Sequence, residues 1–413
     1  MGLQNSVPCW VVGRMTDKLP FVRDAIRMSD LLDASFAGEW GKAEGSALTP
    51  VFRTANFNED GTLDYANPVM RCITEKKVHE KKLRRGDIIL EKSGGTPNRP
   101  VGILAYFDSD DLALCSNFNQ VLRFDARIIV PRYAFYQLRW LKDRNAFDRY
   151  IHKTTGLQNL EMKRFGELEL LVPELSTQLH ITDTLDKVLG AQHQLDAQLA
   201  KLDSLVKSRF VEMFGDGDFP RFRLDKVADV QGGLTKNRRR ETLPMRLPYL
   251  RVANVGPTGG VDTNEMLSIG LTDVEARKTL LKTGDLLFVE GNGSKNQIGR
   301  VAIWDGSIDP CVHQNHLIRA RLYKDVLPIF ALTYFSSPDG RRQITNKAAS
   351  TSGLFTLSTG KIKSLVLPVP PLSLQHEFSD FAAQVDKLRV VAEKEKQTLQ
   401  TLYDSLAQEY FAI

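Results

Sequence analysis

The chain has 413 residues, of which 42% are hydrophobic and 25% charged, and its formal net charge is +5. This length predicts two or three domains, and the composition is typical of a soluble globular protein. The sequence contains no run of 18 or more apolar residues, so we predict no membrane-spanning helix. No signal peptide is visible at the N-terminus. The four cysteines are widely spaced, which favours a reducing cytoplasm over a disulfide framework.

Two dense basic runs stand out along the chain, EKKVHEKKLRR at 75–85 and LTKNRRR at 234–240. One such run is usually a solvated face. RWLKDR (139–144) and GRRQITNK (340–347) are lighter runs. Several runs in a chain with a pI near 8.9 favour a polyanionic partner, because each Lys or Arg placed at a phosphate releases a counterion.

The chain repeats itself. TPVFRTANF (49–57) matches LPYLRVANV (247–255), and RRGDIILEKSGG (84–95) matches KTGDLLFVEGNG (282–293). The same spacing, within two residues, pairs CSNFNQVLR (115–123) with CVHQNHLIR (311–319), Gly102 with Gly299, and 155–178 with 352–375. Matches in one order at one offset indicate two copies of a unit of roughly 197 residues.

In the stretch CVHQNHLIR, Cys311, His313 and His316 are spaced closely enough to supply part of the ligands of a metal site. In this alignment the histidines face Asn117 and Gln120 of the first copy. A metal site needs its ligands, whereas a strand needs only its apolar pattern, so we predict a strand and no metal.

Each copy begins with short apolar or alternating segments separated by Gly, Asn and Asp, which predict a twisted, mostly antiparallel sheet with a few helices. After Pro173 and Pro370 the apolar residues recur at heptad spacing. This spacing predicts one helix of about 40 residues, roughly 60 Å long, in each copy. The heptad core positions form an apolar seam along each helix. In the first helix they are Ile181, Leu185, Val188, Leu195, Leu199, Leu202 and Val206, and in the second Phe378, Phe381, Val385, Leu388, Ala392, Leu399, Leu402 and Leu406. Polar residues, Gln192 and Glu395, occupy one such position in each helix.

The predicted fold class is therefore α/β (α+β) with a two-fold internal repeat. Two globular heads are joined and spaced by two long antiparallel coiled-coil helices, which would put the heads at opposite ends. The alternative is two separate helices, each packed on its own head. The predicted boundaries are head 1 at 1–153, helical spacer 1 at 154–216, head 2 at 217–350 and helical spacer 2 at 351–413.

The usual catalytic motifs are absent. The chain has no GxGxxG after a strand, no GxxxxGK[ST], no HExxH and no GxSxG. We therefore predict that it is not an enzyme.

GDLLFVEGNG, IGRVAIW, CVHQNHLIR, LVPELSTQ and LPVPPLSLQ, with the paired helices, closely resemble the DNA-specificity subunit of Type I restriction-modification systems over nearly the whole chain. The resemblance implies two target-recognition domains that bind a bipartite, asymmetric double-stranded DNA target without catalysis. It implies two modification subunits, which methylate adenine at N6 with S-adenosylmethionine, and restriction (translocase-nuclease) subunits, which use ATP and magnesium. No cofactor is expected on this chain. The sequence before Thr49 matches its counterpart poorly and leaves the start of head 1 open.

Phosphate contacts position such a reader and base contacts specify its target. The expected phosphate contacts are Lys81, Lys82, Arg84 and Arg85 in head 1, and Lys236, Arg238, Arg239 and Arg240 on a glycine-led arm in head 2. The expected base contacts are Ser93, Thr96, Asn98 and Arg99 in head 1, and Asn292, Ser294, Lys295 and Asn296 in head 2. The alternative for each set is a solvated loop or simple turn chemistry. The framework pairs Asn119/Asn315, Arg123/Arg319 and Gly156/Gly353 are expected to be structural.

Three other functions stay open at this point. The chain could be the specificity chain of a Type II fused methylase-nuclease, a coiled-coil interaction scaffold without DNA contact, or an enzyme with an unrecognised site that uses His313 and His316.

Overall fold

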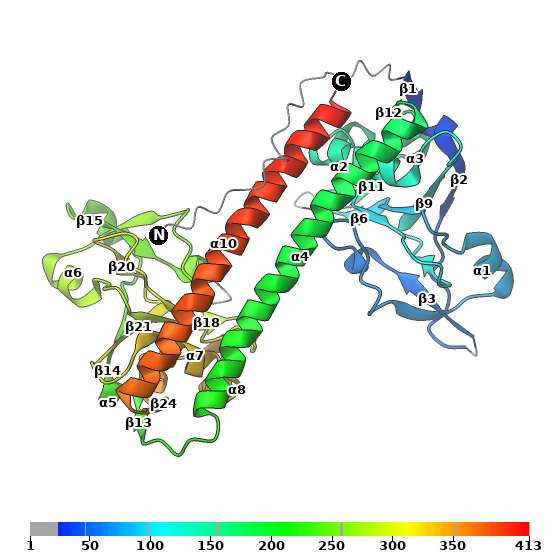
Figure 1. The fold of residues 1–413 in the computed structure, drawn as a ribbon. Coiled ribbons are helices and arrows are strands. Elements are labelled where there is room, and N and C mark those ends of the chain that lie inside the picture. Colours follow the sequence, from blue (N-terminus) through cyan, green and yellow to red (C-terminus); the bar gives the residue numbers. More distant parts are fainter. Residues whose placement is uncertain are drawn as a thin grey trace, which may run out of the picture. The chain divides into compact units, whose positions relative to one another are not determined.

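The computed structural model describes residues 24–412, apart from residues 46, 97–98, 154–156, 257–258 and 352. They form two compact units. Unit 1 takes in the chain up to Gln194 together with Lys396 onward, and unit 2 runs from Leu195 to Glu395. Two 40-residue helices, α4 (Leu175–Phe214) and α10 (Leu372–Phe411), each contribute to both units (Figure 1). The predicted repeat of a mixed α/β part followed by a 40-residue helix is confirmed.

Unit 1 is built on a four-stranded antiparallel sheet in the order β2-β9-β5-β7, with smaller sheets β4-β3-β8, β10-β11-β6 and β1-β12 beside it. Only β3 and β8 pair in parallel among the described strands of this unit. The strands are β1 (Asp24–Arg27), β2 (Leu32–Ala37), β3 (Leu48–Phe52), β4 (Val69–Cys72), β5 (Ile88–Glu91), β6 (Ser93–Gly95), β7 (Leu104–Tyr106), β8 (Leu114–Cys115), β9 (Asn119–Phe124), β10 (Ile151–Lys153), β11 (Gln158–Leu160) and β12 (Glu169–Val172). The helices are α1 (Glu75–Lys81), α2 (Pro131–Asp143) and α3 (Met162–Phe165), with 3-10 turns η2 (Met28–Leu31), η3 (Thr54–Asn56) and η4 (Asp148–Tyr150).

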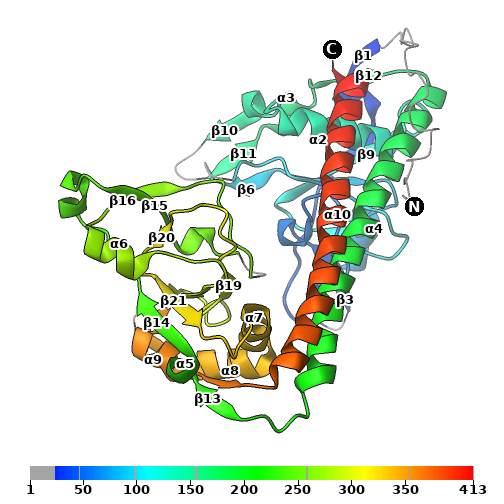
Figure 2. The same ribbon diagram turned by 60° about the vertical axis from the view of Figure 1, so that its left-hand side comes forward.

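Unit 2 repeats this arrangement sheet by sheet: β14-β21-β17-β19, β16-β15-β20, β18-β23-β22 and β13-β24. Figure 2 labels several strands of the first two of these sheets. Its strands are β13 (Arg221–Arg223), β14 (Ala228–Gly232), β15 (Arg246–Leu250), β16 (Leu267–Gly270), β17 (Leu286–Val289), β18 (Gly291–Asn292), β19 (Val301–Ile303), β20 (Val312–His313), β21 (Leu317–Leu322), β22 (Ala349–Thr351), β23 (Leu354–Thr356) and β24 (Val366–Pro368). Its helices are α5 (Leu224–Val227), α6 (Asp273–Thr279), α7 (Pro328–Ser336), α8 (Pro338–Lys347) and α9 (Thr359–Lys363), with 3-10 turns η5 (Arg238–Thr242) and η6 (Val252–Asn254).

The start of head 1, which the sequence left open, has a clear counterpart. β1 pairs with β12 as β13 pairs with β24, and the short turn η2 then leads into β2 as α5 leads into β14. Within the described residues the repeat of unit 1 therefore begins at Asp24, well before the first sequence match at Thr49.

The structure corrects the alignment of CSNFNQVLR with CVHQNHLIR by two residues. β8 and β9 correspond to β20 and β21 at an offset of 198, so that Cys115 matches His313 and Arg123 matches Arg321. The close packing of two glycines agrees with this register. A Cβ on Gly38 would lie 2.2 Å from the carbonyl oxygen of Cys115, and one on Gly233 would lie 2.2 Å from that of His313. The predicted pairs Asn119/Asn315 and Arg123/Arg319 are therefore not equivalent.

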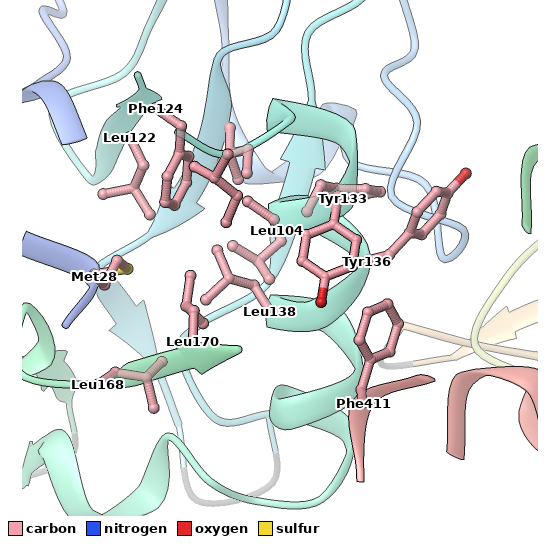
Figure 3. Close-up of a cluster of buried hydrophobic side chains, with 14 of the residues drawn as sticks. Met28, Leu104, Leu122, Phe124, Tyr133, Tyr136, Leu138, Leu168, Leu170 and Phe411 are labelled. Atoms are coloured by element: carbon pink, nitrogen blue, oxygen red, sulfur yellow. The ribbon is translucent and has the colours of Figure 1, made fainter. Parts of the chain in front are cut away.

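In each unit the beginning of one long helix packs against the end of the other. Ile181 and Leu185 of α4 share the core of unit 1 with Leu406 and Phe411 of α10, and Tyr133 of α2 lies against Phe411 with ring centroids 5.5 Å apart (Figure 3). In unit 2 the core includes Phe210 and Phe214 of α4 with Phe378 and Ala382 of α10. The predicted antiparallel pairing is confirmed, and each helix also packs on globular elements.

Polar and exposed positions interrupt the predicted seam. Gln192, the polar residue at a core position of the first helix, is buried and donates a hydrogen bond to Gln400 at 3.2 Å. Leu388 and Leu402 were predicted to lie in the seam, but they are 59% and 43% exposed. That part of the prediction is wrong, because the heptad pattern alone does not separate a seam position from its neighbour on the helix surface.

A glutamine anchors each long helix to its globular part. The fully buried Gln178 accepts from the N–H of Val130, at the N-terminus of α2, and donates to the carbonyl of Pro173, both at 2.7 Å. Gln375 makes the same two bonds in unit 2, with Leu327 at 2.9 Å and Pro370 at 2.8 Å. These side chains pair polar backbone groups that would otherwise be buried alone.

Candidate nucleic-acid interface

The predicted base-contacting loops lie on equivalent small sheets. In unit 1, β6 carries Ser93 opposite Asn159 of β11. In unit 2, β18 carries Asn292 opposite Phe355 of β23. Each loop follows the buried central strand of its unit, β5 or β17, so the framework holds both loops in the same way.

The loop of unit 1 is anchored at its base by a buried carboxylate. Glu91, 2% exposed, accepts from Nη1 of Arg99 at 3.0 Å, and burial raises the pKa of this carboxyl although Arg99 opposes the shift. Thr96 and Arg99 are exposed and bridge each other through their backbones, and Ser93 is half-buried. Asn98 lies outside the described residues. Arg99 thus has an ion-pair partner but still presents half of its side chain to solvent.

Arg99 also lines an open cleft of about 370 Å³ in unit 1. Two further cations, Arg139 and Lys142, line this cleft, as do the carboxylates of Glu59 and Asp143. The two carboxylates offset two of the three cations, so the cleft carries only a small positive excess and does not select strongly for an anion.

The basic run of unit 1 divides into paired and exposed cations. Lys81 binds Glu39 at 3.3 Å, and Arg85 binds Asp108 and Asp110. Lys82 and Arg84 are exposed, and among the described residues no ion pair is found for either. Of the four predicted phosphate contacts in unit 1, these two are therefore the best placed to meet a phosphate.

The basic arm of unit 2 is a 3-10 turn, η5, anchored at one residue. Arg240 binds Glu275 with both terminal nitrogens, at 2.8 and 3.1 Å, and donates to the carbonyls of Thr235 and Gly270. Its hydrogen bonds hold the pKa of Glu275 at about 2. Arg240 is thus engaged within the protein, whereas Lys236, Arg238 and Arg239 are exposed around it.

In the loop of unit 2, Asn292 is half-buried and its side-chain oxygen accepts from the N–H of Ser294 at 2.8 Å, which is simple turn chemistry. Ser294, Lys295 and Asn296 are exposed. The carbonyl of Asn296 accepts from Arg341 at 3.1 Å, which leaves its side chain at the surface. Both sets of predicted contacts stay predictions.

The motif with two histidines folds as a strand and a turn. His313 is fully buried, its Nδ1 lies 3.1 Å from the carbonyl oxygen of Thr279, and burial lowers its pKa to about 4. His316 is exposed and its Nδ1 lies 3.1 Å from Glu290. Within the part of the chain that the structure describes, no three His, Cys, Asp or Glu side chains are grouped to hold a metal ion.

Sequence reasoning missed one feature of this edge. Phe118 is 55% exposed at the turn before β9, next to Ser93. The sequence placed it inside an apolar strand segment. The ring points outward because Ser116 and Asn119 close a turn, which the hydrogen bond from the N–H of Ser116 to the distant carbonyl of Phe52 holds in place.

Chemically, the exposed side chains at these loops are amides, hydroxyls and cations, which suit hydrogen bonds to base edges and ion pairs with phosphates.

No helix in the described residues has the length and apolarity to cross a membrane.

Comparison with known proteins agrees with this fold. The family model of the Type I restriction modification DNA specificity domain matches residues 46–201. The Type I restriction enzyme EcoKI specificity subunit of Escherichia coli K12 is 29% identical over 244 residues, which are 54% of this chain and 51% of that protein. The aligned part therefore spans about half the length of that relative. The StySPI specificity subunit of Salmonella potsdam is 23% identical over 416 residues, 90% of this chain and 88% of the relative.

Solved structures show the same fold. The crystal structure of a Type I restriction-modification S subunit from M. genitalium has a TM-score of 0.55 at 16% identity, covering 97% of this chain and 98% of that one. A chain in a structure of a type I R-M system has a TM-score of 0.54 at 15% identity, covering 95% and 98%. The family model over residues 46–201, the two relatives and the duplicated fold agree, and the chain is similar to the DNA specificity subunits of Type I restriction-modification systems.

Proposed function

We propose that this chain is the non-catalytic reader of a bipartite, asymmetric double-stranded DNA target, each unit reading one half. The observation that carries the proposal is the contrast between framework and loops. Both units have the same sheets in the same order, yet the loops after β5 and β17 carry different side chains. Equal frameworks with unequal loops suit two half-sites of different sequence.

We further propose that the chain holds two modification subunits, which methylate adenine with S-adenosylmethionine, and restriction subunits, which use ATP and magnesium. The family supports these partners, and the chain itself is proposed to carry no cofactor and to work in the cytoplasm of a bacterium or archaeon. The specificity chain of a Type II fused methylase-nuclease is the alternative within DNA recognition, and the neighbouring genes distinguish the two.

The test is a map of adenine methylation across the host genome, with and without this gene. We expect one two-part motif to lose methylation on deletion, which would give both half-sites and the spacer between them. An unchanged map from a host whose modification subunit is active would contradict the proposal. It would favour an interaction scaffold that does not read DNA.

A further inference from the structure

A phenylalanine is held in solvent at the turn between β8 and β9. Phe118 is 55% exposed, whereas Asn119 beside it is fully buried. The turn is ordered on both sides, because the N–H of Asn119 donates to Ser116 at 2.9 Å and that of Ser116 donates to Phe52 at 2.8 Å. The ring is therefore presented outward by the fold, although burial would normally stabilise such a side chain.

Single exposed apolar side chains are common and by themselves indicate nothing. The place of Phe118 is the first observation that sets it apart. Its carbonyl accepts from the N–H groups of Lys92 and Ser93, at 3.0 and 3.2 Å, and its ring lies 3.8 Å from where a Cβ on Gly94 would stand. Phe118 thus borders the loop that carries the predicted base contacts of unit 1.

The second observation is the repeat. In unit 2 the equivalent residue is His316, which also directly precedes its strand and has a side chain 56% exposed. Its carbonyl accepts from the N–H of Glu290 at 2.9 Å, as that of Phe118 accepts from Lys92. Both units therefore present a planar ring at the same turn, but one ring is apolar and the other polar. A framework role would favour one residue type, whereas two different half-sites would favour different rings.

We propose that this turn ring, Phe118 in unit 1 and His316 in unit 2, contacts a base of the half-site that its own unit reads. Phe118 acts through apolar contact with a base edge, such as the methyl group of a thymine, beside hydrogen bonds from the neighbouring loop. The inference rests on the proposed function and adds a specificity-determining residue to it. Since an apolar contact releases no counterion, its loss should leave the salt dependence of binding unchanged.

The experiment uses the full chain co-expressed with its modification subunits and double-stranded DNA libraries in which both half-sites are randomised. For Phe118→Ala we expect lost preference at one or two adjacent positions of one half-site, with the other half-site unchanged as an internal control. Affinity for the wild-type target should fall roughly tenfold, with an unchanged slope of log K against log salt. His316→Ala should alter only the other half-site.

Two further variants keep the test sharp. Leu112→Ala removes an equally exposed apolar side chain, 50% exposed, from elsewhere in unit 1 and should alter neither half-site. Phe118→Trp keeps an apolar ring and should retain most of the affinity. A folded Phe118→Trp variant as weak as Phe118→Ala would overturn the ring contact, as would unchanged selection by Phe118→Ala. A wild-type complex that selects no motif would instead overturn the proposed function, and the ring contact with it.

Discussion

Arg321 holds the carboxylate of Asp285 by two hydrogen bonds, from Nε at 2.8 Å and from Nη2 at 2.7 Å. Arg123 and Asp87 make the same pair at the same distances in unit 1. Both aspartates are 1% exposed. The pair joins the strand β9 or β21 to the turn before the central strand, so it supports the framework that carries each loop.

Loss of this pair should be costly. Arg321→Ala leaves the buried carboxylate of Asp285 without its cation, and we expect unit 2 to lose about 3–5 kcal/mol of unfolding free energy. Urea unfolding followed by circular dichroism measures it. The control Arg342→Ala breaks an exposed pair with Asp339 and should change stability by less than about 0.5 kcal/mol. Equal midpoints for the Arg321→Ala variant and wild type would contradict the assigned pair.

Substitution of the neighbouring residues Arg239 and Arg240 should have different effects, the first on DNA binding and the second on thermal stability. Arg239→Ala should weaken DNA binding and lower the salt slope by about one, without a change in thermal midpoint, because Arg239 is exposed. Arg240→Ala should lower the thermal midpoint, because Arg240 binds Glu275. Filter binding over a range of salt concentrations, with calorimetry on the same samples, checks both. An unchanged salt slope for Arg239→Ala would remove the arm from the interface.

The pair of Arg240 and Glu275 also predicts a pH dependence. The folded pKa of Glu275 is about 2, below the unfolded value of about 4.3, so the pair stabilises the folded state above pH ~4.3. That stability is lost as pH falls from ~4.3 towards 2. Wild type and Arg240→Ala should therefore differ by about 1 kcal/mol at pH 7, and the difference should shrink through this window. A difference that grew on acidification would have the wrong sign.

The glutamine anchor of α4 gives a third stability prediction. Gln178→Leu leaves the N–H of Val130 and the carbonyl of Pro173 buried without partners, at a cost of about 1–3 kcal/mol. The measurement is the urea midpoint, with Gln194→Leu on the exposed face of the same helix as the control. If both variants behaved alike, the anchor would contribute nothing.

The end of α10 should be needed by unit 1 alone. Phe411 is 1% exposed in the core of unit 1, and Phe411→Ala should cost about 3–5 kcal/mol. Amide hydrogen exchange should accelerate in β5 and leave β17 near its wild-type rate. Leu402→Ala, 43% exposed on the same helix, should change neither strand. Equal acceleration in both strands would show that the units unfold together.

The sequence predicted the features that rest on local periodicity. The duplication, the mostly antiparallel sheets and the helix that follows Pro173 all appear in the structure, because heptads and alternation are written in neighbouring residues. The alignment of β9 in the first copy with β21 in the second was wrong by two residues. A slip of two preserves the alternation of inward and outward side chains, so the pattern could not reveal it. Only the distant partners, Asp87 and Asp285, separate Arg321 from Arg319.

The predicted interface was limited in the same way. The run LTKNRRR gives no sign that Arg240 differs from Arg239, because its partner Glu275 lies 35 residues further along. Phe118 likewise read as one more apolar residue of a strand. Its exposure depends on a turn that Asn119 and Ser116 close and that the hydrogen bond from Ser116 to Phe52 holds in place. Local residue types indicated the region, but tertiary contacts decide which side chains reach the surface.

Unit 1 is completed by Leu406, Tyr410 and Phe411, residues that follow the whole of unit 2 in the chain. On the ribosome, the apolar surface around Tyr133 must therefore stay uncovered while roughly 200 further residues are made, about 10–40 s at ordinary rates of translation. A message cut short within unit 2 would yield a first unit that lacks part of its core. Such a product should be cleared by proteases and should not persist as a half-reader able to occupy partners or DNA.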